Sequence, residues 1–246
     1  DITKLEIEEL RKIRSKMQIV FQDPLSSLDP RMTVKKIISE PLTMNKIARG
    51  RDLEERVLML LERVGLSKDH LNRFPHEFSG GQKQRIGVAR ALATEPEFIV
   101  LDEPTSSLDV SVQAQVLNLL KDLQKDLGIS YLFISHDLSV VKHLSNRIAV
   151  MYAGKIVEMN TSERLFVEPK HPYTQALISS IPIPDPDHVI ERKALTGEVP
   201  SPVKPPTGCR FHPRCPNAMP QCEKIEPELI DIKNAHSVAC HLVKKA

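Results

Sequence analysis

Short apolar segments that end abruptly in polar residues constrain the fold of this 246-residue chain more than any other feature. MQIVF (17–21), FIVLD (98–102) and YLFIS (131–135) are predicted to be strands. The last two are apolar on every face, as expected of strands that are covered on both sides. RIAVMY (147–152) and KIVEM (155–159) flank Ala153-Gly154, and this pattern predicts a β-hairpin.

Helical patterns occupy the segments between these strands. Apolar residues recur at helical spacing over 110–127, and Gly128 is a helix stop signal. A second helix is predicted over about 53–64. No convincing strand lies between Gln22 and Phe98, so this part is predicted to be a helical insertion. The alternation of strands and helices predicts an α/β fold.

Composition excludes several classes of protein. The chain is 41% hydrophobic and 27% charged, which is typical of soluble globular proteins. A net charge of +2 with 4% aromatic residues argues against a nucleic-acid binder. No apolar run approaches the roughly 18 residues that a membrane helix needs. The N-terminal residues are too charged for a secretory signal, so we expect a cytosolic protein.

The sequence Ser79-Gly80-Gly81-Gln82 allows two interpretations. Ser79 with Gln82 three residues later forms the pattern of a helix capping box. The same geometry places free N–H groups and the positive end of a helix dipole beside a bare glycine surface, which can bind a phosphate.

Polar residues also follow each predicted strand. Asp102 and Glu103 end the second strand, where open parallel sheets bind ligands, and the pair could hold Mg²⁺ and orient a water. His136 follows the third strand and could reach a phosphate oxygen, although a lone histidine is usually structural. Gln22 follows the first strand. Asp109 is an obvious N-cap for the helix over 110–127.

The order of these motifs points to a family. VFQDP, FSGGQKQR, IVLDEPTSSLD and FISHD resemble, in that order, the Q-loop, signature, Walker B with D-loop, and switch histidine of ABC transporter ATPases. The resemblance covers essentially the whole chain and implies the P-loop NTPase fold of the ABC type. HPYTQALISSIPIPDP (171–186) and GCRFHPRCPNAMPQC (208–222) are similar to the C-terminal extension of oligopeptide and dipeptide importer ATPases. FQDPLSSLDPRMTV (21–34) resembles the F-type subunit more than the D-type.

The resemblance implies a role for each strand-end residue. Asp102 would hold Mg²⁺, and Glu103 would polarise the attacking water. Gln22 would sense Mg²⁺ and the γ-phosphate of ATP, and His136 would contact the γ-phosphate.

The resemblance also implies partners. ATP would lie between two ATPase subunits arranged head to tail, as a homodimer or with a D-type partner. The signature residues Ser79, Gly80, Gly81 and Gln82 would bind the nucleotide held by the other subunit, and Asp109 would cross the interface. Transmembrane permease subunits would hold the protein at the cytoplasmic face of the membrane, and an extracytoplasmic peptide-binding protein would act indirectly.

The implied domains are an ATPase domain over 1–165, with its helical subdomain over about 24–95, and an extension over 166–246. The extension includes a proline-rich linker over about 182–206. No G-x-x-x-x-G-K-[ST] loop occurs in the sequence, although the family places one upstream of the Q-loop. We therefore expect a chain that begins inside a longer subunit and hydrolyses little ATP by itself. Rival interpretations are a non-transport ABC ATPase and a noncatalytic metal-binding module.

All the cysteines lie in the last 38 residues, at Cys209, Cys215, Cys222 and Cys240. Such clustering in an intracellular protein predicts a metal site rather than disulfides. Four thiolates suit a [4Fe–4S] cluster or tetrahedral Zn²⁺, and free buried cysteines are the alternative. The resemblance favours the [4Fe–4S] cluster. Three histidines could substitute as ligands, namely His212, His236 and His241.

Overall fold

The structure, a computed structural model, describes residues 1–23, 27–181, 197–198, 200–201, 203–233 and 235–244. It divides into two compact units, Asp1–His136 and Asp137–Ala246, and each is described by itself. The predicted domain boundary near residue 165 stays a prediction. No helix among the described residues is long and apolar enough to cross a membrane.

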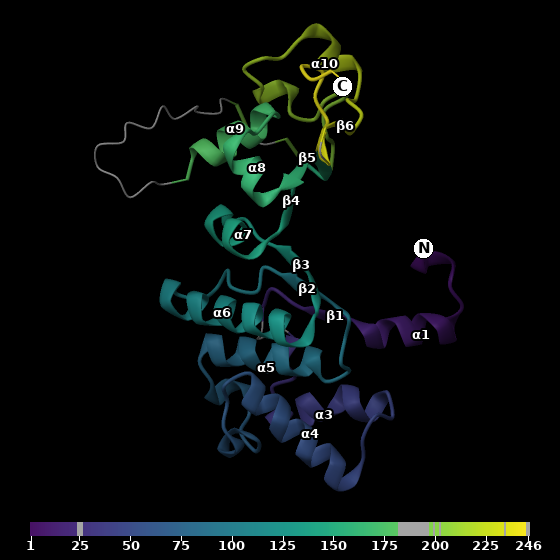
Figure 1. Ribbon diagram of the computed structural model, residues 1–246, viewed down its shortest axis with the longest axis vertical. Helices are drawn as coiled ribbons and strands as arrows, with labels where there is room; N and C mark the ends of the chain where they lie inside the picture. Colours follow the sequence, from purple (N-terminus) through teal and green to yellow (C-terminus); the bar gives the residue numbers. More distant parts are fainter. Residues whose placement is uncertain (24–26, 182–196, 199, 202, 234, 245–246) are drawn as a thin grey trace. The chain divides into compact units, whose positions relative to one another are not determined.

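The first unit is built on a three-stranded parallel sheet in the order β1-β2-β3 (Figure 1). The strands are β1 (Met17–Val20), β2 (Phe98–Asp102) and β3 (Ser130–Ile134). All three were predicted within one residue at each end. Parallel neighbours require crossover connections, which here are helical.

Helices make up the rest of this unit. They are η1 (Ile2–Lys4), α1 (Ile7–Lys16), α3 (Val34–Met44), α4 (Gly50–Arg63), η2 (Lys68–His70), η3 (Pro75–Glu77), α5 (Gly80–Leu92) and α6 (Val110–Leu127). The predicted helix over 53–64 thus begins three residues earlier. The described residues between 27 and 97 contain no strand, which agrees with the predicted helical insertion.

Helix α6 shows how local sequence sets an element's bounds. The side chain of Asp109 accepts a hydrogen bond from the backbone N–H of Val112 and caps the first turn. Gly128 ends the helix with φ 66°, in the left-handed conformation that glycine adopts without steric cost. The buried face of α6 joins the same core as β1 and β2. The predicted bounds of this helix are confirmed.

One face of the sheet departs from expectation. We expected β2 and β3 to be covered on both sides, but Leu132 is 50% exposed and Ile134 is 44% exposed. Ile19, on the same face through the register Ile19–Val100–Leu132, is 40% exposed. The opposite face packs into the helical core through Val20, Ile99 and Leu101. The prediction was wrong for one face because no helix in the described part of the chain buries these side chains, and apolarity alone does not show whether a cover is present.

The second unit combines an antiparallel sheet, in the order β4-β5-β7-β6, with short helices. The predicted hairpin is present: β4 (Arg147–Tyr152) and β5 (Lys155–Thr161) are joined by Ala153 and Gly154, both with positive φ. The other elements are α7 (Leu138–Leu144), α8 (Ser162–Val167), α9 (Pro172–Ser179), η4 (His212–Arg214), α10 (Pro220–Lys224), β6 (Ile230–Lys233) and β7 (His236–Val238). The predicted linker over 182–206 lies largely outside the described residues.

Aromatic side chains form part of the core of this unit. The Phe211 ring is 1% exposed and lies 5.1 Å from the ring of Tyr152 and 5.4 Å from that of Tyr173, centroid to centroid. Phe211 immediately precedes η4, Tyr152 lies in β4 and Tyr173 lies in α9. The cluster therefore joins segments that are distant in sequence.

Candidate functional site

Polar side chains that follow the three parallel strands contact one another. Gln22 lies beyond β1, Glu103 follows β2, and His136 lies beyond β3. The Nε2 atom of Gln22 donates to Glu103 Oε2 at 2.7 Å, and His136 Nδ1 lies 3.0 Å from Glu103 Oε1. The Glu103 side chain is 23% exposed and that of His136 is 73% exposed. The structure therefore brings together three residues that the sequence singled out, with the carboxylate at their centre.

The backbone at Glu103 has an unusual conformation. Its φ is 41°, in the left-handed region that non-glycine residues rarely adopt. Its N–H donates to the carbonyl of Ile134 at 3.0 Å, and its own carbonyl accepts from the Ser106 hydroxyl at 3.1 Å. Asp102, the last residue of β2, pairs in register with Ile134. Strained backbone of this kind concentrates at functional sites, where the surrounding structure holds it in place.

A second group of predicted residues lies at the starts of α5 and α6. Ser79 caps α5: its hydroxyl accepts from the Gln82 N–H at 3.4 Å, and Gln82 Oε1 accepts from the Ser79 N–H at 3.1 Å. The predicted capping box is thus confirmed. Asp109 caps α6, and its hydrogen bonds from the Val112 N–H and the Ser111 hydroxyl lower the pKa of its carboxyl.

The two helix starts pack closely. A Cβ atom added at Gly81 would lie 2.2 Å from Val112 Cγ1, and one at Gly80 would lie 3.1 Å from Leu108 Cδ2. The glycines therefore allow the signature turn to approach the segment that carries Asp109. Uncapped N–H groups at a helix start can bind an anion, while the carboxylates beyond β2 suit a hydrated divalent cation.

Comparisons with known proteins agree with this geometry. The ABC transporter family pattern matches residues 1–106, and the family described as oligopeptide/dipeptide transporter, C-terminal region, matches residues 157–222. The putative oligopeptide transport ATP-binding protein YkfD of Bacillus subtilis is 57% identical over 236 residues, which are 94% of this chain and 71% of that protein. This chain belongs to the ATP-binding proteins of ABC transporters.

Two further matches support the assignment. The oligopeptide transport ATP-binding protein AppF of Bacillus subtilis is 52% identical over 98% of this chain and 74% of its own length. The dimeric, post-hydrolysis structure of the ATP-binding cassette MJ0796 bound to ADP and Pi matches with a TM-score of 0.57 at 31% identity. That match covers 65% of this chain and 68% of the other. The predicted ABC-type ATPase fold and the recognition of the peptide-importer branch are confirmed.

The close approach at Gly81 gives a test of packing between α5 and α6. We expect Gly81→Ala to destabilise the protein by roughly 1–3 kcal/mol, because the added methyl group overpacks against Val112. Gly87→Ala is the matched control, since a Cβ atom there meets nothing within 4 Å and alanine favours helix. Urea unfolding curves of the two variants measure the difference. Equal stability of the two variants would show that the packing of α5 against α6 tolerates a methyl group at Gly81.

The four cysteines gather in the second unit without forming a recognisable metal site. Burial and, to a lesser extent, the other cysteines raise the pKa of the Cys240 thiol to about 11. Burial likewise raises the pKa of Cys209 and Cys215. Among the described residues, which include all four cysteines, no group of three or more His, Cys, Asp or Glu side chains is arranged to hold a metal ion. The expected [4Fe–4S] or Zn²⁺ site is therefore not supported by the arrangement of these side chains.

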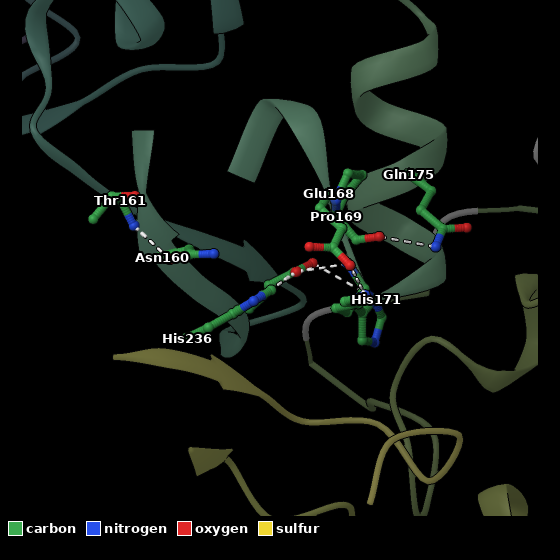
Figure 2. Close-up of polar contacts among 9 residues, drawn as sticks. Asn160, Thr161, Glu168, Pro169, His171, Gln175 and His236 are labelled. Atoms are coloured by element: carbon green, nitrogen blue, oxygen red, sulfur yellow. Dashed lines mark hydrogen bonds and ion pairs between the residues drawn. The ribbon is translucent and has the colours of Figure 1, made fainter. Parts of the chain in front are cut away.

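A buried polar cluster in the second unit was missed by sequence reasoning. The carboxylate of Glu158, in β5, is fully buried and accepts from the N–H groups of Lys170 and His171 at 2.7 and 2.9 Å. His236 Nε2, from β7, contacts the same carboxylate at 2.7 Å. Figure 2 shows His171 and His236 in this cluster, together with Gln175, whose Nε2 donates to the Pro169 carbonyl at 3.0 Å. A charged residue at a buried position of the hairpin was the available sequence signal.

The lowered pKa of His171 leads us to predict that the stability of the protein depends on pH. Burial lowers the pKa of His171 to about 4 from 6.5, and the nearby Glu158 carboxylate opposes this shift. Its Nδ1 accepts from the Tyr173 N–H at 3.1 Å, as a neutral ring can. The unfolded chain therefore binds the proton more readily between pH 6.5 and about 4, and stability falls as the pH is lowered through this window.

We expect the free energy of unfolding to fall by roughly 3 kcal/mol between pH 7 and pH 4 because of the shifted pKa of His171. Urea unfolding at several pH values measures it. His171→Asn, which keeps an acceptor for the Tyr173 N–H, should show a smaller loss over the same range. Parallel pH profiles for the two proteins would contradict the expectation.

Proposed function

We propose that this chain is the ATP-hydrolysing subunit that energises the import of oligopeptides or dipeptides through an ABC transporter. The hydrogen-bonded arrangement of Gln22, Glu103 and His136 at the ends of adjacent parallel strands carries the proposal. The peptide-importer relatives and the match at residues 157–222 support the class of cargo.

Each residue of the strand-end group has a proposed role in hydrolysis. Asp102 would hold Mg²⁺ through its shell of water, and the ion neutralises charge that develops on the phosphates. Glu103 would orient and accept a proton from the attacking water. His136 would contact the γ-phosphate, and Gln22 would sense its presence. Since Gln22 and His136 both contact the Glu103 carboxylate, either can fix its direction.

The helix-start group would act on a nucleotide held by a second subunit. Ser79, Gly80, Gly81 and Gln82 present helix N–H groups and a surface without side chains, which suits a γ-phosphate. Asp109 would cross the interface between subunits. Completion of the site then requires dimer closure, so ATP favours the closed state and hydrolysis releases it. The dimeric cassette among the matched structures supports a second ATPase subunit, which we propose is a D-type partner or a second copy of this chain.

The remaining partners belong to the same proposal. Permease subunits would bind the helical subdomain over about 24–95 and hold the protein at the cytoplasmic face of the membrane. An extracytoplasmic binding protein would deliver the peptide.

Peptide uptake by the assembled importer tests the proposed function. Vesicles that contain the permease and both ATPase subunits, one of which includes the residues of this chain, are supplied with Mg-ATP on the side of the ATPase subunits. We expect accumulation of a labelled peptide that depends on ATP and on this chain. Equal accumulation from vesicles assembled without this chain would refute the proposal.

We further propose that the four cysteines bind a metal centre, a [4Fe–4S] cluster or alternatively Zn²⁺. Three observations support a shared centre. Cys209 N–H donates to the Cys222 carbonyl at 2.8 Å, and each of Cys209, Cys215 and Cys240 is close enough for other cysteine thiols to affect its pKa. The backbone N–H groups of Phe211, Asn217 and Leu242 also donate to the sulfurs of Cys209, Cys215 and Cys240, respectively. Such donors stabilise thiolates in metal sites. The side chains as placed are not arranged to hold an ion, so binding requires them to turn toward a common point.

Metal analysis of protein purified without oxygen tests this part of the proposal. We expect stoichiometric iron and sulfide, and their loss together with lower stability of the tail in Cys215→Ser. Stoichiometric zinc in a colourless protein would favour the alternative. Protein free of both metals, with unchanged stability in Cys215→Ser, would contradict a metal centre.

A further inference from the structure

The second unit contains a cavity of about 670 Å³ that none of the proposed steps uses. Its volume lies within the range of about 300–1,000 Å³ that is usual for small-ligand sites. The floor consists of buried apolar side chains from three segments: Val157 is 6% exposed, Phe211 is 1% exposed and Ala239 is 7% exposed.

Exposed apolar side chains form the walls of the cavity. Met151 from β4 is 60% exposed, Ile156 from β5 is 38% exposed, and Leu229, which precedes β6, is 43% exposed. Large apolar side chains that stay in contact with water at a concave surface mark a ligand site more often than singly scattered ones do. Among the described residues, Cys209 is the one cysteine in the lining, so the other three proposed metal ligands do not contribute to the cavity.

Two cations and two carboxylates also line the cavity. Lys155 Nζ pairs with Glu226 Oε1 at 2.6 Å, with both side chains about half exposed. Arg210, which also lines the cavity, donates to the carbonyl of Ala153 in the β4–β5 turn. Glu228 completes the set. The formal charges of these four side chains sum to zero. A ligand that carries charge of only one sign would therefore be repelled by as many of them as attract it.

A ligand with an apolar body and two separate opposite charges matches both the apolar side chains and the oppositely charged side chains of the lining. We infer that this cavity binds a short peptide that has apolar side chains and free termini. Its carboxylate would pair with Arg210 and Lys155, and its ammonium group with Glu228 and Glu226. An exposed ion pair contributes little stability, so the Lys155–Glu226 pair can exchange partners at small cost. The inference deepens the proposed function and rests on it for the presence of such peptides on the side of the ATPase subunits.

Calorimetric titration of the full chain with the tripeptide Leu-Ala-Leu tests the inference. We expect saturable binding of one peptide per chain, and binding at least about tenfold weaker when both termini are blocked by acetylation and amidation. Leu229→Asp should weaken the affinity by at least about tenfold, because it places an unpaired carboxylate against the apolar body of the ligand. Val167→Asp is the matched control, since Val167 is 84% exposed at the end of α8 and does not line the cavity.

Binding that is not saturable, or that is equal for free and blocked peptides, overturns the inference. Unchanged affinity in Leu229→Asp also overturns it. The titration needs neither ATP nor permease, so a negative result leaves the proposed function standing. An importer that fails to hydrolyse ATP would refute the proposed function and leave the titration result unchanged.

Discussion

Replacing Glu103 by glutamine in the assembled importer should lower the rate of ATP hydrolysis by roughly 10²–10⁴-fold, the usual contribution of a general base. The amide keeps the size of the side chain and can still accept a hydrogen bond from Gln22, whose Nε2 lies 2.7 Å from the carboxylate. It cannot take a proton from water. The expected loss is therefore in the chemical step and not in folding. Phosphate release in the presence of Mg-ATP measures it.

Glu97→Gln provides the matched control. Glu97 precedes β2, at the opposite end of the strand from Glu103, and its exposed carboxylate pairs with Lys16 at 2.6 Å. Because exposed ion pairs contribute little, we expect hydrolysis within about twofold of the unchanged importer. A similar fall in both variants would mean that the effect of Glu103→Gln is not local to the strand end.

Replacing Glu158 by alanine should destabilise the second unit by roughly 3–5 kcal/mol, because each buried donor left without its acceptor costs about 1–3 kcal/mol. The carboxylate is fully buried and satisfies the N–H groups of Lys170 and His171 and the ring of His236. Without it, these buried donors lose their acceptor. Urea unfolding measures the global loss. Hydrogen exchange of the amides of Lys170 and His171 reports the local one.

Glu168→Ala is the control for this prediction. Glu168 lies ten residues further along the chain, and its side chain is 70% exposed and paired with Lys170 at the surface. We expect a change of no more than about 1 kcal/mol. If Glu158→Ala were as stable as Glu168→Ala, the buried carboxylate would not hold β5, β7 and the start of α9 together.

Features that depend on neighbouring residues could be predicted from the sequence. The capping box of Ser79 and Gln82 spans three residues, and Asp109 caps its helix within the same distance. The β4–β5 turn is likewise set by the adjacent pair Ala153-Gly154. Glu103 and His136 could be placed at strand ends from the apolar segments that precede them, and parallel strands bring such ends to one edge of a sheet. Gln22 was singled out only by the family resemblance.

Features that depend on distant segments could not be predicted. Glu158 and His236 are 78 residues apart, and no spacing rule connects them. The exposure of Leu132 and Ile134 was missed because an apolar strand has the same sequence whether or not a helix covers it. The cysteines were expected to form a metal site from their clustering and from the family resemblance, whereas ligation also needs side chains directed at a common point, which local sequence does not determine.

The fate of bound ATP tests the central claim, that the strand-end residues of one subunit and the helix-start residues of the other act on one triphosphate. The assembled importer carrying Glu103→Gln is incubated with labelled Mg-ATP, filtered rapidly, and analysed for bound ATP and ADP. With two copies of this chain in the importer, we predict retained ATP with little ADP, and loss of the retained ATP when Ser79→Arg is added to Glu103→Gln. Bound ADP at the level of the unchanged importer, or ATP retention that does not depend on Ser79, would contradict the claim.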